Sequence, residues 1–78
     1  GLQLIACTEK AKEDIYKVNY TIPSAIILGS EKDGISEEYL SMSNTQVKIP
    51  MMGETKSLNV SVSAGVILYQ AIHQRNNI

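Results

Sequence analysis

The segment that most constrains the fold is the apolar run Ala25–Leu28 (AIIL), which is stopped by Gly29. The run is short, rich in branched side chains and free of polar residues, so it lacks the alternation of a strand with one wet face. Uninterrupted runs of this kind are typical of a parallel strand that is covered on both faces. Parallel strands need long crossover connections, and the run therefore predicts an α/β arrangement.

The rest of the chain divides into segments that suit a mainly parallel sheet. Strands are expected at residues 2–7 and 46–49, a short helix or irregular crossover at residues 8–20, and helices from Ser36 and over residues 58–74. Ser36 and Ser57 are the expected N-caps of the two helices. One face of the last helix is expected to carry its apolar side chains, namely Val60, Ala64, Ile67, Leu68, Ala71 and Ile72.

Size and charge limit the classes of function. A chain of 78 residues suits one small domain or part of a larger one, and it buries only about 60–65% of its unfolded surface. The net charge of −1 gives no sign of the basic patch of a nucleic-acid binder, so RNA binding would need phosphate contacts from elsewhere. Cys7 is the only cysteine, so an intrachain disulfide is impossible. Cys7 and His73 together are too few ligands for a metal site. Short apolar runs and the lack of a signal peptide predict a soluble cytoplasmic chain with no membrane association.

Two segments at strand ends are candidates for ligand binding. Residues 28–34 (LGSEKDG) follow the best strand, at the end where open α/β sheets bind ligands. Gly29 would let the backbone approach a ligand closely, although an ordinary strand-to-helix turn has the same pattern. A phosphate-binding loop is excluded, because no Lys-Ser/Thr pair follows Gly34. Residues 47–51 (VKIPM) end a strand at Pro50 and leave backbone groups for an adenine edge, or simply end a strand.

The third segment, residues 57–65 (SLNVSVSAG), holds small polar side chains at a helix start. Such residues usually cap a helix or allow close packing. A serine nucleophile needs a nearby base, and none lies within sequence reach. The carboxylates of Glu31, Asp33 and Glu54 lie in loops, where solvation is the ordinary role and a metal or acid–base group is the alternative. No metal site is expected.

Taken together, the three segments AIILGSEKDGIS, VKIPM and SLNVSVSAGVILYQ closely resemble the second and third motifs of the SpoU (TrmH-like) family of SPOUT RNA 2′-O-ribose methyltransferases. The resemblance covers about residues 21–75 in order and spacing, and the strand LQLIAC fits more weakly. It implies an α/β knot fold, in which the C-terminal part of an open, mainly parallel sheet domain is tucked through a loop as a deep trefoil knot. Residues 1–78 would be the C-terminal portion of that domain.

The resemblance also implies S-adenosyl-L-methionine as cofactor and a ribose 2′-hydroxyl of tRNA or rRNA as methyl acceptor. The implied cofactor contacts are Leu28, Gly29, Gly34, Ile49, Met51, Ser57 and Leu58. The implied catalytic residues are Glu31, which would orient an Arg or loop amides, and the polar pair Ser57 and Asn59. The sulfonium already makes the methyl group electrophilic, so no metal is required. Members of the family are usually homodimers with the last helix at the interface.

One departure from the family pattern is large. The first motif, an Asn with a downstream Arg, is absent, and Arg75 is the only arginine. The N-terminal half of the domain would therefore be missing, and the chain alone should not catalyse and should bind cofactor weakly. Apolar surface should be exposed where the missing strands would pack, and self-association should follow. Two alternatives stay open: a non-catalytic dimerisation or RNA-associated module with the same fold, and a nucleotide-binding α/β domain of another family.

Overall fold

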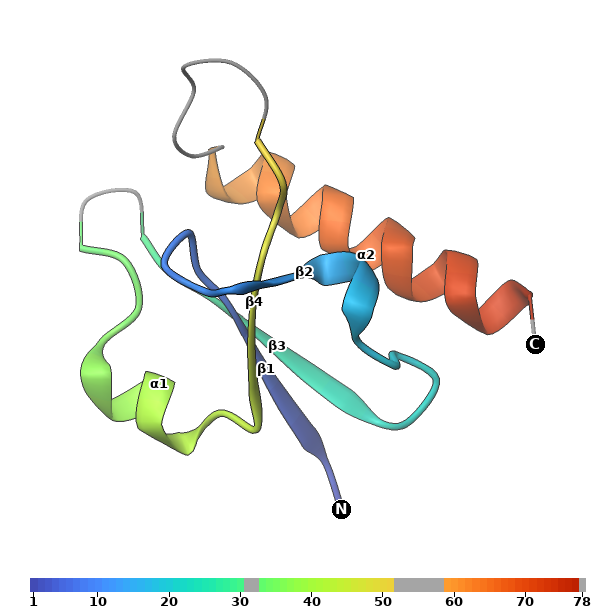
Figure 1. The fold of residues 1–78 in the computed structure, drawn as a ribbon, viewed down its shortest axis with the longest axis horizontal. Helices are drawn as coiled ribbons and strands as arrows, with labels where there is room; N and C mark the ends of the chain where they lie inside the picture. The colour runs from blue at the N-terminus through green and yellow to red at the C-terminus, as the bar shows by residue number, and fades with distance from the viewer. Residues whose placement is uncertain (31–32, 52–58, 78) are drawn as a thin grey trace.

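The computed structural model describes residues 1–30, 33–51 and 59–77. Within these residues a four-stranded parallel sheet has the order β2-β4-β1-β3 (Figure 1). The elements are β1 (Gln3–Cys7), β2 (Glu13–Asp14), the 3-10 helix η1 (Ile15–Lys17), β3 (Ser24–Leu28), α1 (Glu37–Met42), β4 (Thr45–Lys48) and α2 (Val60–Asn76). The predicted parallel α/β arrangement is confirmed.

β1 lies between β3 and β4 and carries the longest pairing. It pairs with β3 from Gln3↔Ser24 to Cys7↔Leu28, and its second half pairs with β4. Asn44 extends that second edge, because its backbone N–H donates to the Leu4 carbonyl at 2.8 Å and its Oδ1 accepts from the Leu4 N–H at 2.7 Å. All strands are parallel, so their carboxyl ends meet at one edge of the sheet.

β3 differs from its prediction in one respect. Its sequence predicts a strand covered on both faces, yet all five residues are only half-buried and β3 is an edge strand. β1 covers one edge of β3, and no described element pairs with the other. The apolar side chains of β3 are therefore less buried here than their sequence predicts.

The core is formed between the sheet, the crossover at residues 8–23 and α2. Its fully buried large side chains are Ile5, Ile15, Tyr20, Val47 and Ile67. The Tyr20 hydroxyl donates to the Ile15 carbonyl at 2.5 Å, so its polar tip is satisfied inside this core. Full burial of each branched side chain contributes roughly 1.5–3 kcal/mol.

Residues 8–20 were predicted to form either a short helix or an irregular crossover, and the structure shows the irregular crossover. It consists of turns, β2 and η1 rather than an α-helix. Ala11, Ile15 and Val18 have helical spacing and are all buried, although no α-helix connects them. β2 instead pairs with β4, through Glu13↔Val47 and Asp14↔Lys48.

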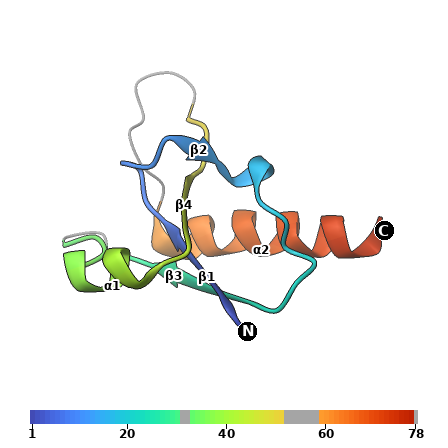
Figure 2. The same cartoon turned by 60° about the horizontal axis from the view of Figure 1, so that its bottom comes forward.

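α1 begins as its sequence predicts. Ser36 caps it by accepting from the Tyr39 N–H at 3.4 Å, and Glu37 and Glu38 occupy the first turn. α2 begins later than predicted, and its N-cap is Asn59, whose Oδ1 accepts from the Ser61 N–H at 2.8 Å. The predicted cap Ser57 lies outside the described residues. Both views place η1 beside α2, and α1 at the opposite side of the molecule from the C-terminus of α2 (Figures 1 and 2).

The inward face of α2 also differs from its prediction. Ile67 is buried, but Leu68 and Ile72 are 51% and 49% exposed. Gln74 lies two turns after Ile67 and hydrogen-bonds to the crossover at Val18 and Tyr20. Because of this contact, the face of α2 that carries Ile67 and Gln74 packs against the core. Leu68 and Ile72 lie on the neighbouring face, which is exposed to solvent. Within the described residues, neither helix combines the length and hydropathy that crossing a bilayer requires.

Candidate cofactor-binding site

A cavity of about 600 Å³ lies at the carboxyl ends of β1, β3 and β4. Its volume is in the range of small-molecule sites, roughly 300–1,000 Å³. Its described lining comes from the turn after β1, the loop after β3, α1, the end of β4 and the first turn of α2. The lining residues are Cys7, Thr8, Glu9, Lys10, Leu28, Gly29, Ser30, Asp33, Gly34, Ile35, Leu40, Ile49, Met51, Asn59, Val60 and Ser63.

The predicted site residues gather around this cavity as far as the structure describes them. Those that line it are Leu28, Gly29, Gly34, Ile49, Met51 and Asn59. Three others, Glu31, Ser57 and Leu58, lie outside the described residues. The three sequence segments, which are far apart in the chain, therefore contribute to one site.

Gly29 is required by the shape of its own loop. A Cβ at Gly29 would lie 2.3 Å from the carbonyl carbon of Gly34 and 2.6 Å from the nitrogen of Ile35. The loop closes through the Gly34 N–H, which donates to the Ser30 carbonyl at 2.9 Å. Gly34 has a φ of +68°, a conformation that favours glycine. The close neighbour of Gly29 is therefore the backbone of its own loop, whereas the sequence predicted a close approach to a ligand.

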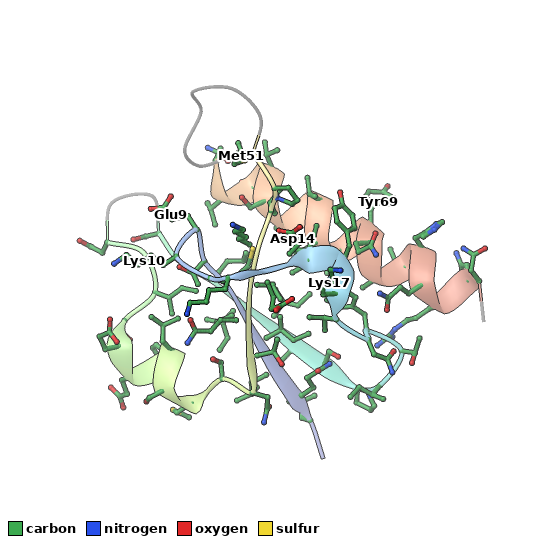
Figure 3. All side chains as sticks on the ribbon, in the orientation of Figure 1. Glu9, Lys10, Asp14, Lys17, Met51 and Tyr69 are labelled. Carbon is green, nitrogen blue, oxygen red and sulfur yellow. The ribbon has the colours of Figure 1, made fainter. Side chains whose placement is uncertain are left out.

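The wall formed by the turn after β1 was missed by the sequence analysis. Thr8 fixes this turn: its N–H donates to the Val47 carbonyl at 2.8 Å and its Oγ1 accepts from the Lys10 N–H at 3.3 Å. Glu9 and Lys10 lie at the same end of the molecule as Met51 (Figure 3). The position of this turn directly after a parallel strand was the signal that could have identified it.

Cys7 is half-buried and lines the cavity. Burial raises the pKa of the Cys7 thiol. The thiol therefore stays protonated and weakly nucleophilic near neutral pH. This environment suits a packing role against a ligand rather than covalent chemistry.

The chemistry of the cavity is that of a binding site. Its described charged residues are Glu9, Lys10 and Asp33, and no group of three or more His, Cys, Asp or Glu side chains in the described chain can hold a metal ion. Backbone groups at strand ends, with Ile49 and Val60 beside them, suit a flat ring with polar edges. The Asn59 carboxamide is already used as the α2 cap, so it is held in a fixed position.

Comparison with known proteins identifies related sequences. The sequence model of the SpoU rRNA Methylase family matches residues 1–69. The tRNA (guanosine(18)-2′-O)-methyltransferase of Thermus thermophilus is 52% identical over 62 residues, which are 80% of this chain and 32% of that protein. The enzyme of the same name from Escherichia coli K12 is 41% identical over 78 residues, 99% of this chain and 34% of that protein. The chain thus spans about a third of the length of these relatives.

Solved structures extend the likeness to the fold. A TrmH/SpoU tRNA modifying enzyme from A. aeolicus has a TM-score of 0.90 and 37% identity, over 99% of this chain and 40% of that one. The SpoU methyltransferase AviRb from Streptomyces viridochromogenes, in complex with AdoMet, has a TM-score of 0.94 and 31% identity, over 100% of this chain and 31% of that one. With a family match over residues 1–69 and a shared fold throughout, this chain belongs to the SpoU rRNA methylase family.

Proposed function

We propose that the chain is the cofactor-binding, C-terminal part of an S-adenosylmethionine-dependent RNA 2′-O-methyltransferase that acts on a ribose in tRNA or rRNA. The observation that carries the proposal is the convergence of three distant segments on one cavity of about 600 Å³. Relatives named as tRNA and 23S rRNA guanosine 2′-O-methyltransferases support it. Family membership removes the alternative of a nucleotide-binding domain from another family.

The residues present suit this cofactor. Leu28, Gly29, Gly34, Ile49 and Met51 would hold it, largely through backbone groups at the strand ends. When bound, the cofactor supplies a methyl group made electrophilic by its sulfonium. The chain's own task is to orient the bound molecule so that the acceptor oxygen meets the methyl group in line, which is worth several orders of magnitude in rate.

Among the residues that the structure describes, no arginine lines the cavity to assist removal of the hydroxyl proton. Arg75 does not line the cavity, because its Nε donates to the Tyr20 carbonyl at 2.9 Å and its guanidinium reaches the Ile22 carbonyl at 3.3 Å. It fastens α2 to the crossover. We therefore propose that the arginine of the family's first motif lies in a polypeptide segment outside residues 1–78.

We further propose that the protein forms a homodimer, that its chain is knotted and that it is located in the cytoplasm. Exposed apolar side chains on α2, among them Val62, Leu68, Tyr69 and Ile72, support self-association through this helix. The fold shared with solved SpoU methyltransferase structures supports a trefoil knot, and an experimental structure of the full natural polypeptide tests that topology. We also propose a cytoplasmic location, which cell fractionation tests.

A second candidate function is a non-catalytic dimerisation or RNA-associated module. The absence of a cavity-lining arginine among the described residues favours it. A first motif with an arginine in the full natural polypeptide would exclude it. Methyl transfer from labelled cofactor to RNA is the corresponding activity measurement.

Calorimetric titration with S-adenosylhomocysteine, the reaction product, tests the binding proposal on this chain and on the full natural polypeptide. Met51→Asp places a charge in the cavity lining and should abolish binding, whereas Met42→Asp, at an exposed position of α1, should not. Saturable binding that Met51→Asp removes supports the cofactor site. Binding by the full polypeptide alone places part of the site outside this chain. Absence of binding by either would refute the methyltransferase and favour the module.

A further inference from the structure

The charged side chains of the cavity come from two neighbouring loops. Among the described lining residues, Glu9 and Lys10 lie on the turn after β1 (Figure 3), and Asp33 lies in the loop after β3. Cys7 pairs with Leu28 at the ends of these two strands, so the two loops leave the sheet side by side. The end of β4 and the start of α2 contribute only uncharged described residues, namely Ile49, Met51, Asn59, Val60 and Ser63. The described lining therefore has a charged side at β1 and β3 and an uncharged side at β4 and α2.

The backbone of Lys10 is fixed, while its side chain is exposed. Its N–H donates to the Thr8 Oγ1 at 3.3 Å. The next residue, Ala11, is buried and donates its N–H to the Thr8 carbonyl at 3.1 Å. Within the described residues the Lys10 ammonium forms no ion pair. It can therefore pair with an anionic group of a ligand without giving up a bond inside the protein.

Asp33 is positioned in a similar way on the neighbouring loop. Its N–H donates to the Ser30 Oγ at 3.0 Å, and the loop closes directly after it through the Gly34 N–H, which donates to the Ser30 carbonyl. The side chain of Asp33 is exposed and lines the cavity. Two adjacent loops thus offer an ammonium and a carboxylate to the same ligand.

This mixture of signs favours a zwitterionic group over a polyanion. An RNA backbone carries negative charge alone and is bound through lysines and arginines. Glu9 and Asp33 would repel it beside Lys10. An α-amino acid group carries one carboxylate and one ammonium, which complement Lys10 and Asp33 in charge. S-adenosylmethionine has such a group at the end opposite its adenine ring.

We propose that Lys10 and Asp33 hold the amino-acid end of the cofactor, with Lys10 pairing with its carboxylate and Asp33 accepting hydrogen bonds from its ammonium. This inference rests on the proposed cofactor site and adds the residues that recognise one end of the ligand. The uncharged side of the cavity at β4 and α2 is left for the adenine ring. Both residues act on binding, so their contribution is measured without RNA and without turnover.

Calorimetric titration of the full natural polypeptide with two ligands tests the role of Lys10. S-adenosylhomocysteine carries the amino-acid end, and 5′-methylthioadenosine lacks it. Lys10→Met should raise the dissociation constant for S-adenosylhomocysteine about fivefold, as expected for an ion pair at a partly exposed position, and by less at high salt. The dissociation constant for 5′-methylthioadenosine should change less than about twofold. Lys12→Met, at an exposed position of the same crossover outside the described lining, should leave both values unchanged.

A third ligand assigns the two charges separately. S-adenosyl-3-thiopropylamine is S-adenosylhomocysteine without its carboxylate, so Lys10→Met should no longer weaken its binding. Asp33→Asn should weaken this ligand and S-adenosylhomocysteine by the same factor, because both carry the ammonium. It should bind 5′-methylthioadenosine as the wild type does.

The outcomes separate this inference from the cofactor site itself. If Lys10→Met weakens S-adenosylhomocysteine and 5′-methylthioadenosine equally, Lys10 does not recognise the amino-acid end and the inference is overturned. Unchanged affinity for S-adenosylhomocysteine overturns it too, and weaker RNA binding by that variant would assign Lys10 to a phosphate instead. A wild type that binds neither ligand refutes the cofactor site, and this inference with it.

Discussion

Gln74 connects the last turns of α2 to a backbone segment formed much earlier in the chain. Its Nε2 donates to the Val18 carbonyl at 2.6 Å, and its Oε1 accepts from the Tyr20 N–H at 2.6 Å. One side chain thus satisfies an N–H and a carbonyl that have no strand beside them. An amide is the side chain with both functions at this spacing.

Replacement of Gln74 by leucine should lower the free energy of unfolding by about 2–4 kcal/mol, because it leaves a part-buried donor and acceptor unpaired. Urea denaturation of the full natural polypeptide measures this loss. Gln46→Leu, at an exposed position of β4, is the matched control and should stay within about 0.5 kcal/mol of the wild type. Equal stability of the two variants would contradict the bridging role of Gln74.

Tyr20 and Cys7 predict how stability depends on alkaline pH. Burial, with a smaller contribution from Cys7, raises the pKa of Tyr20 from its ordinary value of 10.0 to about 12. Burial also raises the pKa of the Cys7 thiol. Both groups release protons more readily when unfolded, so stability is complete below their unfolded pKa values and is lost as pH rises through the folded ones.

We therefore expect the free energy of unfolding to fall between about pH 10 and about pH 12, the interval between the unfolded and folded pKa of Tyr20. Chemical denaturation at a series of pH values measures the slope. Tyr20→Phe removes the titrating hydroxyl and should flatten the profile above pH 10, although it also loses the hydrogen bond to Ile15. A slope that Tyr20→Phe leaves unchanged would assign the effect to another group.

At the scale of the element, α2 has one face on the cavity and another on an open surface groove, which is lined by Tyr16, Val62, Gly65, Val66, Tyr69 and Gln70. Its first turn lines the cavity through Val60 and Ser63, and Val62 and Gly65 line the groove. A ligand that fixes one face of a rigid helix also fixes the other. Binding in the cavity and self-association at the groove should therefore be coupled.

We expect S-adenosylhomocysteine to tighten the dimer, and dimerisation to tighten S-adenosylhomocysteine by the same factor, as thermodynamic linkage requires. A coupling of about 5-fold or more is the expected size. Sedimentation with and without ligand gives one factor, and titrations above and below the dimer dissociation constant give the other. In Met51→Asp the ligand should no longer affect association. Equal dimer affinity with and without saturating ligand would show that the two faces act independently.

The sequence predicted where helices and strands begin and end better than it predicted which of their side chains face the core. The end of β3 before Gly29 and the cap at Ser36 depend on local chemistry, and they were predictable. β4 ends at Lys48, two residues before Pro50. Asn59 and Ser57 are both good caps by residue type, so local sequence does not choose between them. In the structure the N-cap of α2 is Asn59. The outward position of Leu68 depends on the contact of Gln74 with the crossover, which no local pattern contains. The turn after β1 could have been located from its position after a predicted strand, but its hydrogen bond to Val47 depends on the pairing of another strand.

At the scale of the whole molecule, β3 indicates a larger sheet. Its run AIIL suits an interior parallel strand, yet it forms an edge and stays half-buried here. The relatives are about three times as long as this chain. Edge strands normally carry charges or short lengths that discourage pairing, and Ala25–Leu28 carries none.

We expect β3 to be an interior strand in the full natural polypeptide. Hydrogen exchange of the peptide covering residues 24–28 should be slower there than in the 78-residue chain. The peptide covering β4, which already lies between β2 and β1, is the internal control and should change little. Equal exchange of residues 24–28 in both polypeptides would show that β3 remains an edge.

The sheet order β2-β4-β1-β3 has a consequence for synthesis on the ribosome. Each strand finds its partner only after an intervening segment has been made, as for Gln3 with Ser24, Ile5 with Thr45 and Glu13 with Val47. Such distant pairings carry loop-closure entropy and slow folding. β2 emerges early but waits for β4, and the crossover waits for Gln74 at the far end of α2. This domain can therefore close only after residues up to Gln74 have emerged from the ribosome, and until then its apolar strands lack their native cover.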